Sequence, residues 1–597
     1  MRASQRAGPL SVHATAGTHV VLLGINLRER DLAGLLGFAI ERTDHTENER
    51  SWLRGFRTFE DTEPRPAAGA SVSLRMHPLQ GFLWSDFTAK PDHRYTYRLV
   101  ALRGRPKHLE ESQEVEVQVT TETEHDGTHS VYFNRGIAGS QAYAVRFGNR
   151  HPDDVPDGQA YAWLSRGLVE AVSHFIAQAK NSNWGLRASV YEFTAPCILQ
   201  AFAHAKARGA DVRIVFDAKR NQRPGADEEP HGNPRDRNLT AIAAAELQAL
   251  TLPRESNARY ISHNKFIVLL HRGEPVAVLT GSTNLTPGGL YGHSNVAHVV
   301  RDPAVATTFL RYWEQLANDP EARSLRQWTE QATPVPSVPP PHGCTPLFSP
   351  RASLDALKWY RDRMREARSG VFLTAAFGVN DLLEEVLAED VDFPRYVLLD
   401  REDDHMELLR RDRDNRIAVG SVLQGNVLER WVRERTVPGL NGHVKYIHTK
   451  YLLIDPLGPD PLVITGSANF SDASTRNNDE NMLVIRGDTR VADIYLGEFM
   501  RLFNHFYFRS SVANRPSPRR NLAPDDAWTR AYYSPGSFKS RERLLFAGGN
   551  SRHARRCPSP RSRSMRPGRA HPGHDVIRTT TAQRCHPVTK SCSSLIS

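Results

Sequence analysis

Two short segments of the chain combine residue types that can perform nucleophilic and acid–base chemistry. Each begins with His-x-Lys and continues, after a gap, with Gly-Ser-x-Asn; the residues concerned are His263, Lys265, Ser282 and Asn284 in the first copy and His448, Lys450, Ser467 and Asn469 in the second. The spacing from the histidine to the serine is the same in both copies, and so is the spacing from the histidine to the asparagine. Equal spacing in two places indicates a duplicated site.

This set of residues suits attack on a phosphodiester. A neutral imidazole can attack phosphorus and form a covalent intermediate, while a protonated one can give its proton to the leaving oxygen. Lysines and the short polar side chains of Ser and Asn can hold the anionic phosphate oxygens. The kit is complete without a metal or another cofactor, so we expect neither.

Buried strands are expected to position these residues. An apolar run follows each His-x-Lys, at 266–270 and at 451–454, and a second one precedes each Gly-Ser. Residues i and i+2 of a strand share a face, so each histidine should point the same way as its lysine. Pairing the two copies would gather both sets around one cleft.

The surrounding sequence predicts a duplicated α/β domain. Helical patterns at 167–176, 198–207, 354–367 and 381–388 alternate with strand patterns at 188–193, 212–216, 370–377 and 396–400. Phe193 corresponds to Phe377, and Asp217 to Asp400, at nearly the same offset that relates the two motifs. Such alternation is typical of a mostly parallel sheet with helices on both faces.

The paired motifs resemble those of the phospholipase D superfamily. The second copy has the family pattern in full, with His448, Lys450, Asp455, Gly466, Ser467, Asn469 and a later acid, Glu480. The resemblance covers roughly residues 135–548. It implies two α-β-α domains related by a pseudo-twofold axis, and phosphodiester cleavage through a phosphohistidine. Members of the family act on phospholipid headgroups or on nucleic acids.

The first copy departs from the family pattern at two positions. Leu270 stands where the Asp belongs, and either Asn295, at strict offset, or Ser294, with a one-residue gap, stands where Glu480 lies in the second copy. In the family, this acid tends to orient the histidine of the opposite half. The resemblance therefore implies that Glu480 fixes His263 as the nucleophile and that His448 is the acid/base. Asp455 joins the catalytic set, mainly in a supporting role.

The first 125 residues predict an all-β domain. Apolar and polar residues alternate at 95–101 and 115–119, and the stretch 87–101 loosely resembles a fibronectin type III or immunoglobulin-like module. The complete prediction is a β-sandwich accessory domain at 1–125, a first phospholipase D-like domain at 135–330, a Pro-rich linker at 331–345, a second such domain at 346–548, and a disordered tail at 549–597.

Charge and composition narrow the choice of substrate and location. The chain of 597 residues has a net charge of +10, but residues 551–597 hold ten Lys and Arg against one acid, so the rest is near neutral. No run of apolar residues is long enough for a membrane span, and the five cysteines suggest no disulfide framework. We expect a cytoplasmic monomer that hydrolyses or transfers phospholipid headgroups. The alternatives are a metal-independent nuclease and a non-catalytic phosphodiester-binding protein.

Overall fold

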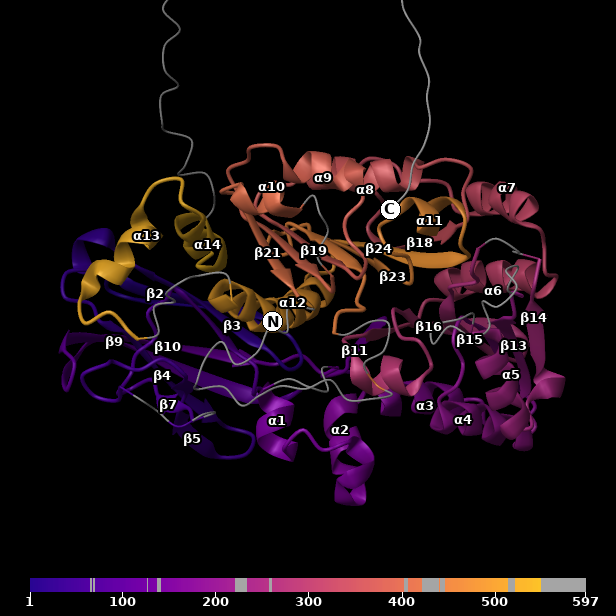
Figure 1. The fold of residues 1–597 in the computed structure, drawn as a ribbon, viewed down its shortest axis with the longest axis horizontal. Coiled ribbons are helices and arrows are strands. Elements are labelled where there is room, and N and C mark those ends of the chain that lie inside the picture. Colours follow the sequence, from indigo (N-terminus) through magenta and orange to yellow (C-terminus); the bar gives the residue numbers. More distant parts are fainter. Residues whose placement is uncertain are drawn as a thin grey trace, which may run out of the picture. The chain divides into compact units, whose positions relative to one another are not determined.

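The computed structural model describes residues 1–548 except 65–66, 68–69, 126, 137–140, 221–233, 257–259, 402–405, 421–439, 441–445 and 514–520. The predicted tail at 549–597 lies outside the described residues. The described part begins with an all-β region and continues with two α/β halves (Figure 1).

The all-β region contains two four-stranded antiparallel sheets. One has the order β1 (Arg2–Ala7), β2 (Leu10–Ala16), β3 (Val21–Leu27) and β8 (Leu83–Asp86). The other has the order β10 (His108–Thr120), β9 (Arg94–Arg105), β4 (Gly37–Asp44) and β5 (Glu49–Trp52), and β6 (Arg54–Gly55) pairs with β7 (Val72–Ser73). Inward residues of both sheets, such as Val12 and Leu99, share one apolar core, as the period-two pattern predicts.

The first α/β half is built on a seven-stranded sheet. Its order is β11 (His129–Phe133), β17 (Val296–Val300), β16 (Glu274–Gly281), β15 (Lys265–His271), β12 (Trp184–Val190), β13 (Asp211–Asp217) and β14 (Thr251–Arg254). The helices are α1 (Gln141–Phe147), α2 (Gln159–Ser165), α3 (Leu168–Ala177), α4 (Pro196–Ala207), α5 (Arg235–Ala244), α6 (Pro303–Ala317) and α7 (Ala322–Ala332).

The second half repeats this topology strand for strand. Its sheet has the order β18 (Gly343–Ser349), β24 (Glu480–Arg486), β23 (Leu462–Gly466), β22 (Tyr451–Ile454), β19 (Val371–Ala375), β20 (Arg395–Leu399) and β21 (Asn415–Val419). Its helices are α8 (Asp355–Arg365), α9 (Asp381–Leu387), α10 (Met406–Arg411), α11 (Asp472–Arg476) and α12 (Thr489–Ala513). The predicted duplication of the fold is confirmed.

The prediction of mostly parallel sheets is wrong. Among the described strands, parallel pairing is limited to β12–β13 and β13–β14 in the first half and to β19–β20 and β20–β21 in the second. The strands β15, β16 and β17 pair antiparallel with one another. Only Arg272 and Gly273 lie between β15 and β16, and two strands joined by so short a connection can only run in opposite directions.

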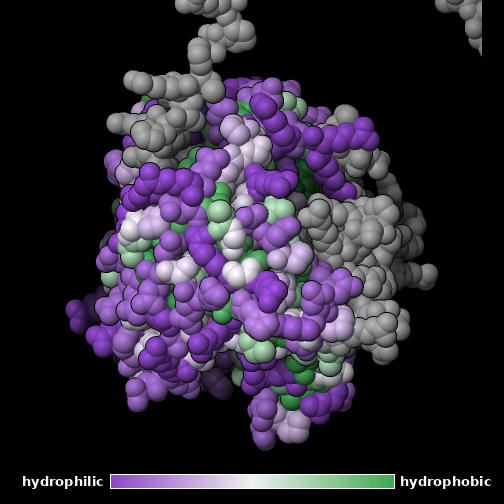
Figure 2. Space-filling model, turned by 90° about the vertical axis from the view of Figure 1, so that its left-hand side faces the viewer, coloured by the Kyte–Doolittle hydropathy of each residue, from purple (hydrophilic) through white to green (hydrophobic). Residues whose placement is uncertain are grey.

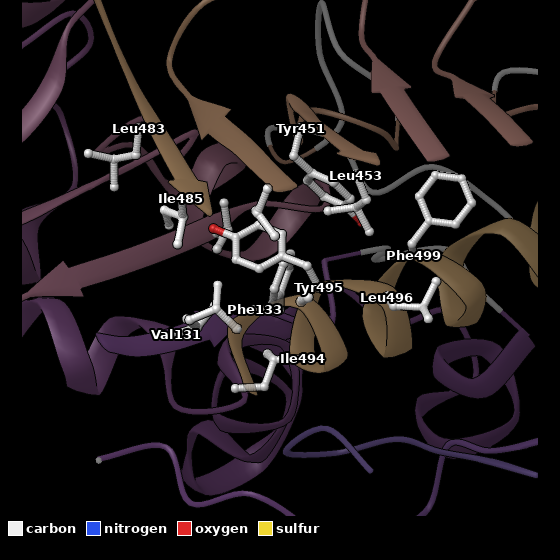
Figure 3. Packing of buried hydrophobic residues seen from close by; sticks show 14 of the residues in the cluster. Val131, Phe133, Tyr451, Leu453, Leu483, Ile485, Ile494, Tyr495, Leu496 and Phe499 are labelled. Atoms are coloured by element: carbon white, nitrogen blue, oxygen red, sulfur yellow. The ribbon is translucent and has the colours of Figure 1, made fainter. Parts of the chain in front are cut away.

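Helices cover both faces of each sheet. Along β15, Phe266 and Val268 pack against α6, while Ile267 and Leu269 pack towards α3 and α4. The inner cluster continues without a break into the second half, where α12 packs on β22 and β24. Figure 3 shows this packing, with Val131 and Phe133 of β11 beside Tyr495 of α12. The two halves therefore share one hydrophobic core.

The all-β region is joined tightly to the second half. The Arg2 guanidinium binds Asp493 of α12 at 2.8 Å and donates to the carbonyl of Leu457. Gly24 of β3 lies so close to the last helix, α14 (Phe538–Phe546), that a Cβ there would fall 1.9 Å from the Phe546 carbonyl oxygen. Trp528, just before α13 (Arg530–Tyr533), belongs to the β core. The last described segment of the chain thus packs against both the all-β region and the second half.

On the side drawn in Figure 2, polar residues cover most of the surface, with apolar ones in small groups between them.

Candidate active site

The two halves meet at the segments that carry the motifs. Ser262 forms a parallel bridge with Asp479, and Ser294 forms one with Ile447. The backbone N–H of His263 donates to the Asp479 carbonyl at 2.9 Å, and that of His448 donates to the Ser294 carbonyl at 3.2 Å. These contacts are equivalent under the offset that relates His263 to His448. Each histidine is therefore held by the half to which it does not belong.

A buried aspartate anchors the segment before each histidine. The Asp217 carboxylate accepts the backbone N–H of Ser262 at 2.6 Å. The Asp400 carboxylate accepts the N–H groups of Tyr446 and Ile447, both at 2.8 Å. These aspartates are among the positions that recur in the sequence repeat, and their task becomes visible only in the fold.

His263 is oriented by Glu480 of the second half. Its Nδ1 donates to the Glu480 Oε2 at 2.9 Å, and the same oxygen accepts the Ser467 hydroxyl at 2.7 Å. The Ser467 oxygen in turn accepts the N–H of Asn481 at 3.0 Å. With the proton on Nδ1, the Nε2 of His263 is left with its lone pair when the ring is neutral.

His448 has the equivalent arrangement with an amide in place of the acid. Its Nδ1 lies 2.9 Å from the Asn295 Oδ1, which also accepts the Ser282 hydroxyl at 2.9 Å. The N–H of Val296 donates to the Ser282 oxygen at 3.1 Å. Asn295, and not Ser294, is therefore the counterpart of Glu480. The hydroxyls of Ser282 and Ser467, which we predicted to bind phosphate, donate in the structure to these partner groups.

The two lysines lie beside the histidines and are fully or almost fully buried. Each Nζ donates to the backbone carbonyl of its own motif histidine, Lys265 to His263 at 2.8 Å and Lys450 to His448 at 2.6 Å. Lys265 also lies over the ring of Tyr191, 5.3 Å from its centroid. An ammonium group has three hydrogens, so each lysine keeps donors for a substrate.

Burial and mutual repulsion set the charge state of the cluster. Burial lowers the pKa of His263 to about 4; Glu480 opposes this shift, and Lys265 and Lys450 add to it. Burial also places the pKa of His448 well below its usual value, and Lys450, His293, Lys265 and His263 lower it further. The pKa of Lys265 falls to about 7, chiefly through burial. Because these groups act on one another across the two halves, they form a single electrostatic unit.

Three predicted residues remain: Asp455, Asn284 and Asn469. Asp455 follows the far end of β22 from Lys450, where its carboxylate accepts the N–H groups of Arg368, Ser369 and Gly370 at 2.6–3.1 Å. It caps the loop at 368–370, and its supporting role in the reaction stays a prediction. The Nδ2 of Asn284 donates a hydrogen bond to the Oε2 of Glu192 at 2.5 Å. In the other half, the Asn469 Oδ1 is buried without a partner among the described residues.

Three residues near the histidines were not singled out from the sequence. The ring centroid of Tyr191 lies 4.9 Å from that of His263, and the centroid of His293 lies 4.9 Å from that of His448. Glu192 is the third, through its contact with Asn284. None of the three belongs to the repeated motif, so the sequence pattern does not indicate that they lie near the histidines.

Two groups of acidic and histidine side chains in the described part of the chain have the spacing of metal ligands. They are Asp44–Glu47–His93 and Asp390–Asp412–Asp414, and neither includes a motif residue. In the first, Glu47 is paired with Lys90 and Asp44 with His93. Within the same described ranges, no helix combines the length and apolarity that crossing a membrane requires.

The fold and the site together define a class: a duplicated α/β protein in which each half contributes one histidine–lysine pair to a common buried cluster. A family model described as "Cardiolipin synthase, PLD-like domain" matches residues 172–317 and 394–503. No curated protein sequence matches the chain.

Several solved structures are similar to parts of the chain. Polyphosphate kinase from Porphyromonas gingivalis is 14% identical with a TM-score of 0.35, over 54% of this chain and 46% of the kinase, so the chain spans a little under half of that enzyme. Phosphatidylserine synthase from Haemophilus influenzae is 14% identical with a TM-score of 0.40, over 57% of this chain and 85% of the synthase. Nuc from Salmonella typhimurium, a phospholipase D family member, is 30% identical with a TM-score of 0.20, over 25% of this chain and 86% of Nuc.

The chain belongs to the phospholipase D family. Members of this superfamily are enzymes that act on phosphodiesters. The matched regions contain His263 and Lys265 in one half and His448 and Lys450 in the other, the residues that the fold brings together.

Proposed function

We propose that the protein is a metal-independent phosphodiesterase of phospholipase D type, which hydrolyses or transfers phospholipid headgroups through a phosphohistidine. The observation that carries the proposal is the reciprocal pairing of the two histidines, His263 with Glu480 and His448 with Asn295. Each pairing holds a proton on Nδ1 and leaves Nε2 for the reaction.

The unequal partners favour different roles for the two rings. When the Nε2 of His263 attacks phosphorus, the ring becomes cationic, and the Glu480 carboxylate at 2.9 Å stabilises that charge. His448 has only the neutral Asn295 at its Nδ1, so its imidazolium receives no such support and gives up its proton readily. This supports His263 as the nucleophile and His448 as the acid/base.

The reaction then proceeds in two displacements. The Nε2 of His263 forms a bond to phosphorus as the bond to the leaving oxygen breaks, and His448 transfers its proton to that oxygen. In the second step His448 takes a proton from water or an acceptor alcohol, whose oxygen attacks phosphorus and releases His263. Lys265 and Lys450 stabilise the phosphate oxygens in both steps. Bringing the anionic phosphate against these groups favours the protonated form of His448 that the first step needs.

Two observations support a lipid substrate. The matching family model is named for cardiolipin synthase, and the sequence before residue 551 has almost no net charge. Proteins that bind long nucleic acids usually present a strongly basic surface.

A direct assay tests the proposal. The full chain is incubated in EDTA with labelled phosphatidylcholine, phosphatidylglycerol, single-stranded DNA and duplex DNA, with His263→Ala and His448→Ala as controls. Release of choline or formation of a transfer product by the wild type, and not by the variants, is expected. Shortened oligonucleotide would replace the lipid assignment with a nuclease, and binding without turnover would contradict catalysis altogether.

A further inference from the structure

A third histidine lies against the predicted acid/base and is not part of the repeated motif. His293 is only 8% exposed, and its ring centroid is 4.9 Å from that of His448 with the planes inclined by 58°. Under the offset that relates His263 to His448, the equivalent position in the second half is Asn478. The halves thus differ at this position as well as at Asn295 and Glu480.

The orientation of the Asn295 amide decides which atoms of His293 and His448 carry protons. Its Nδ2 lies 2.7 Å from the Gly289 carbonyl oxygen, which can only accept a hydrogen bond. The amide oxygen therefore faces Ser282 and His448. The second Nδ2 hydrogen points to the Nδ1 of His293 at 3.0 Å. His293 must accept there, so its own proton resides on Nε2.

The other half shows the same contact with donor and acceptor exchanged. The Nδ2 of Asn478 lies 3.4 Å from the Glu480 Oε1, so a donor at position 478 meets an acceptor at 480. In the first half, residue 295 offers a donor, and residue 293 supplies the acceptor that it requires. Without that acceptor the buried N–H would keep only a long contact with the His293 backbone carbonyl at 3.5 Å, and weakening a buried hydrogen bond is costly. In both halves, therefore, one residue of the pair donates and the other accepts: Asn295 donates to His293, and Asn478 donates to Glu480.

We propose that His293 is a positioning residue: together with the Gly289 carbonyl it fixes the Asn295 amide, and through that amide it holds His448 in the tautomer that carries a proton on Nδ1 and leaves Nε2 for the reaction. The assignment of His448 as acid/base rests on the proposed function, whereas the control of its tautomer does not. A chain of hydrogen bonds runs from His293 Nδ1 through the Asn295 amide to His448 Nδ1, and it is consistent in only one arrangement of protons.

A neutral His293 also makes it easier for the neighbouring His448 to take up a proton. The groups that act most strongly on His448 are Lys450, His293, Lys265 and His263, none of which is acidic. A proton on His293 would therefore oppose protonation of His448. Burial, aided by Lys450, lowers the pKa of His293 to about 3, and its committed Nδ1 acceptor works in the same direction.

Two nearly isosteric substitutions separate the functions of the two ring nitrogens. Asparagine places its amide near the position of Nδ1, and glutamine places its amide near Nε2. We expect His293→Asn to keep the contact with Asn295 and a kcat within about threefold of the wild type. We expect His293→Gln and His293→Ala to lower kcat about tenfold or more, a fraction of the usual acid–base contribution, with little change in KM.

Substrates with different leaving groups show whether the fall in kcat of His293→Gln arises from a defect in proton transfer by His448. An alkyl leaving oxygen needs a proton, whereas p-nitrophenolate leaves without one. With a p-nitrophenyl phosphodiester, His293→Gln should retain the burst of phosphoenzyme formation and lose the steady-state rate, because hydrolysis of the intermediate needs His448 as a base. Melting temperatures within about 3 °C of the wild type would show that the variants are folded.

The ¹⁵N spectrum of labelled histidines gives a readout that does not depend on turnover. His448 is assigned by the signal missing in His448→Gln, and its shifts report which nitrogen carries the proton. The Nδ1–H form is expected in the wild type and in His293→Asn, and a mixture in His293→Gln. An unchanged His448 signal in His293→Gln would overturn the proposal, as would full kcat in that variant with a loss in His293→Asn. Absence of turnover in the wild type would count against the proposed function alone.

Discussion

A carboxylate beside His263 and a neutral amide beside His448 make two similar imidazoles unequal. Both rings are buried, so both prefer the neutral form, and of the two only His263 has an anion at its Nδ1. The Glu480 carboxylate alone would raise the pKa of His263. Burial and the two lysines outweigh the carboxylate, and the pKa of His263 falls to about 4. His263 can therefore be neutral and still have its cationic product stabilised.

The assignment of roles predicts where a covalent intermediate forms. With a slow p-nitrophenyl phosphodiester labelled in its phosphoryl group, His448→Ala should accumulate labelled protein, because the intermediate forms but is not hydrolysed. His263→Ala should retain no label. Quenching in alkali, which preserves phosphohistidine, followed by peptide mapping measures both. Label retained by His263→Ala would reverse the assignment.

The lowered pKa values predict an acid-shifted pH profile. The nucleophile must be neutral, so kcat/KM should fall tenfold per pH unit below about 4, where His263 becomes protonated. The acid must be protonated, and the pKa of free His448 is well below 6.5, so kcat/KM should also fall as the pH rises past that value. The optimum for an alkyl phosphodiester is expected on the acid side of pH 6.5. A plateau reaching pH 8 would contradict this expectation.

At the scale of elements, short antiparallel hairpins place the motifs and a capped loop supports one of them. Strand β15 begins at Lys265, and β22 begins just after Lys450, so each histidine lies outside the strand, where the opposite half can reach it. The sequence predicted that each motif would adjoin a buried strand. It did not predict the strand directions, because an apolar run looks the same in parallel and antiparallel sheets.

A substitution at Asp455 shows whether this acid supports the fold or takes part in the reaction. Asp455→Asn should lower the free energy of unfolding by about 1–3 kcal/mol, because its carboxylate accepts several backbone N–H groups of the loop at 368–370. Asparagine tolerates the positive φ of 49° at this position. The kcat of the folded enzyme should stay within about twofold. Asp460→Asn, which removes an exposed pair with Arg486, is the control. A large loss of kcat without loss of stability would place Asp455 in the reaction.

At the scale of the whole molecule, we expect the buried lysine Lys265 to reduce stability and the contact of the all-β region with the last helix to increase it. Lys265 has a folded pKa of about 7, below its ordinary value of about 10.4. Between these values the unfolded chain binds more protons than the folded one, so stability should rise with pH across this window. Lys265→Met should abolish activity, raise the melting temperature by a few degrees at pH 7, and flatten this pH dependence. Calorimetry from pH 7 to pH 9.5 measures the effect, and a variant less stable than the wild type would contradict it.

The contact between Gly24 and the last helix should make the described part unfold as one unit. An alanine at this position would place its Cβ against the backbone of Phe546, which cannot move aside easily. Gly24→Ala is expected to lower the melting temperature and to split the transition in two. At Gly55, in the same region, a Cβ would meet only the end of the Leu74 side chain, so Gly55→Ala is the matched control. A single unshifted transition in Gly24→Ala would show that the contact adds nothing.

The sequence by itself determined the duplication, the two histidine–lysine motifs and the family to which they belong. These features depend on which residues recur at a fixed spacing, and that spacing can be read directly from the sequence. The tertiary structure decided that Asn295 is the partner of His448, that Ser282 and Ser467 serve the partner groups, and that His293 and Tyr191 lie beside the reacting rings. Each of these facts joins residues of different elements, often of different halves, and such contacts are set by how the shared core packs.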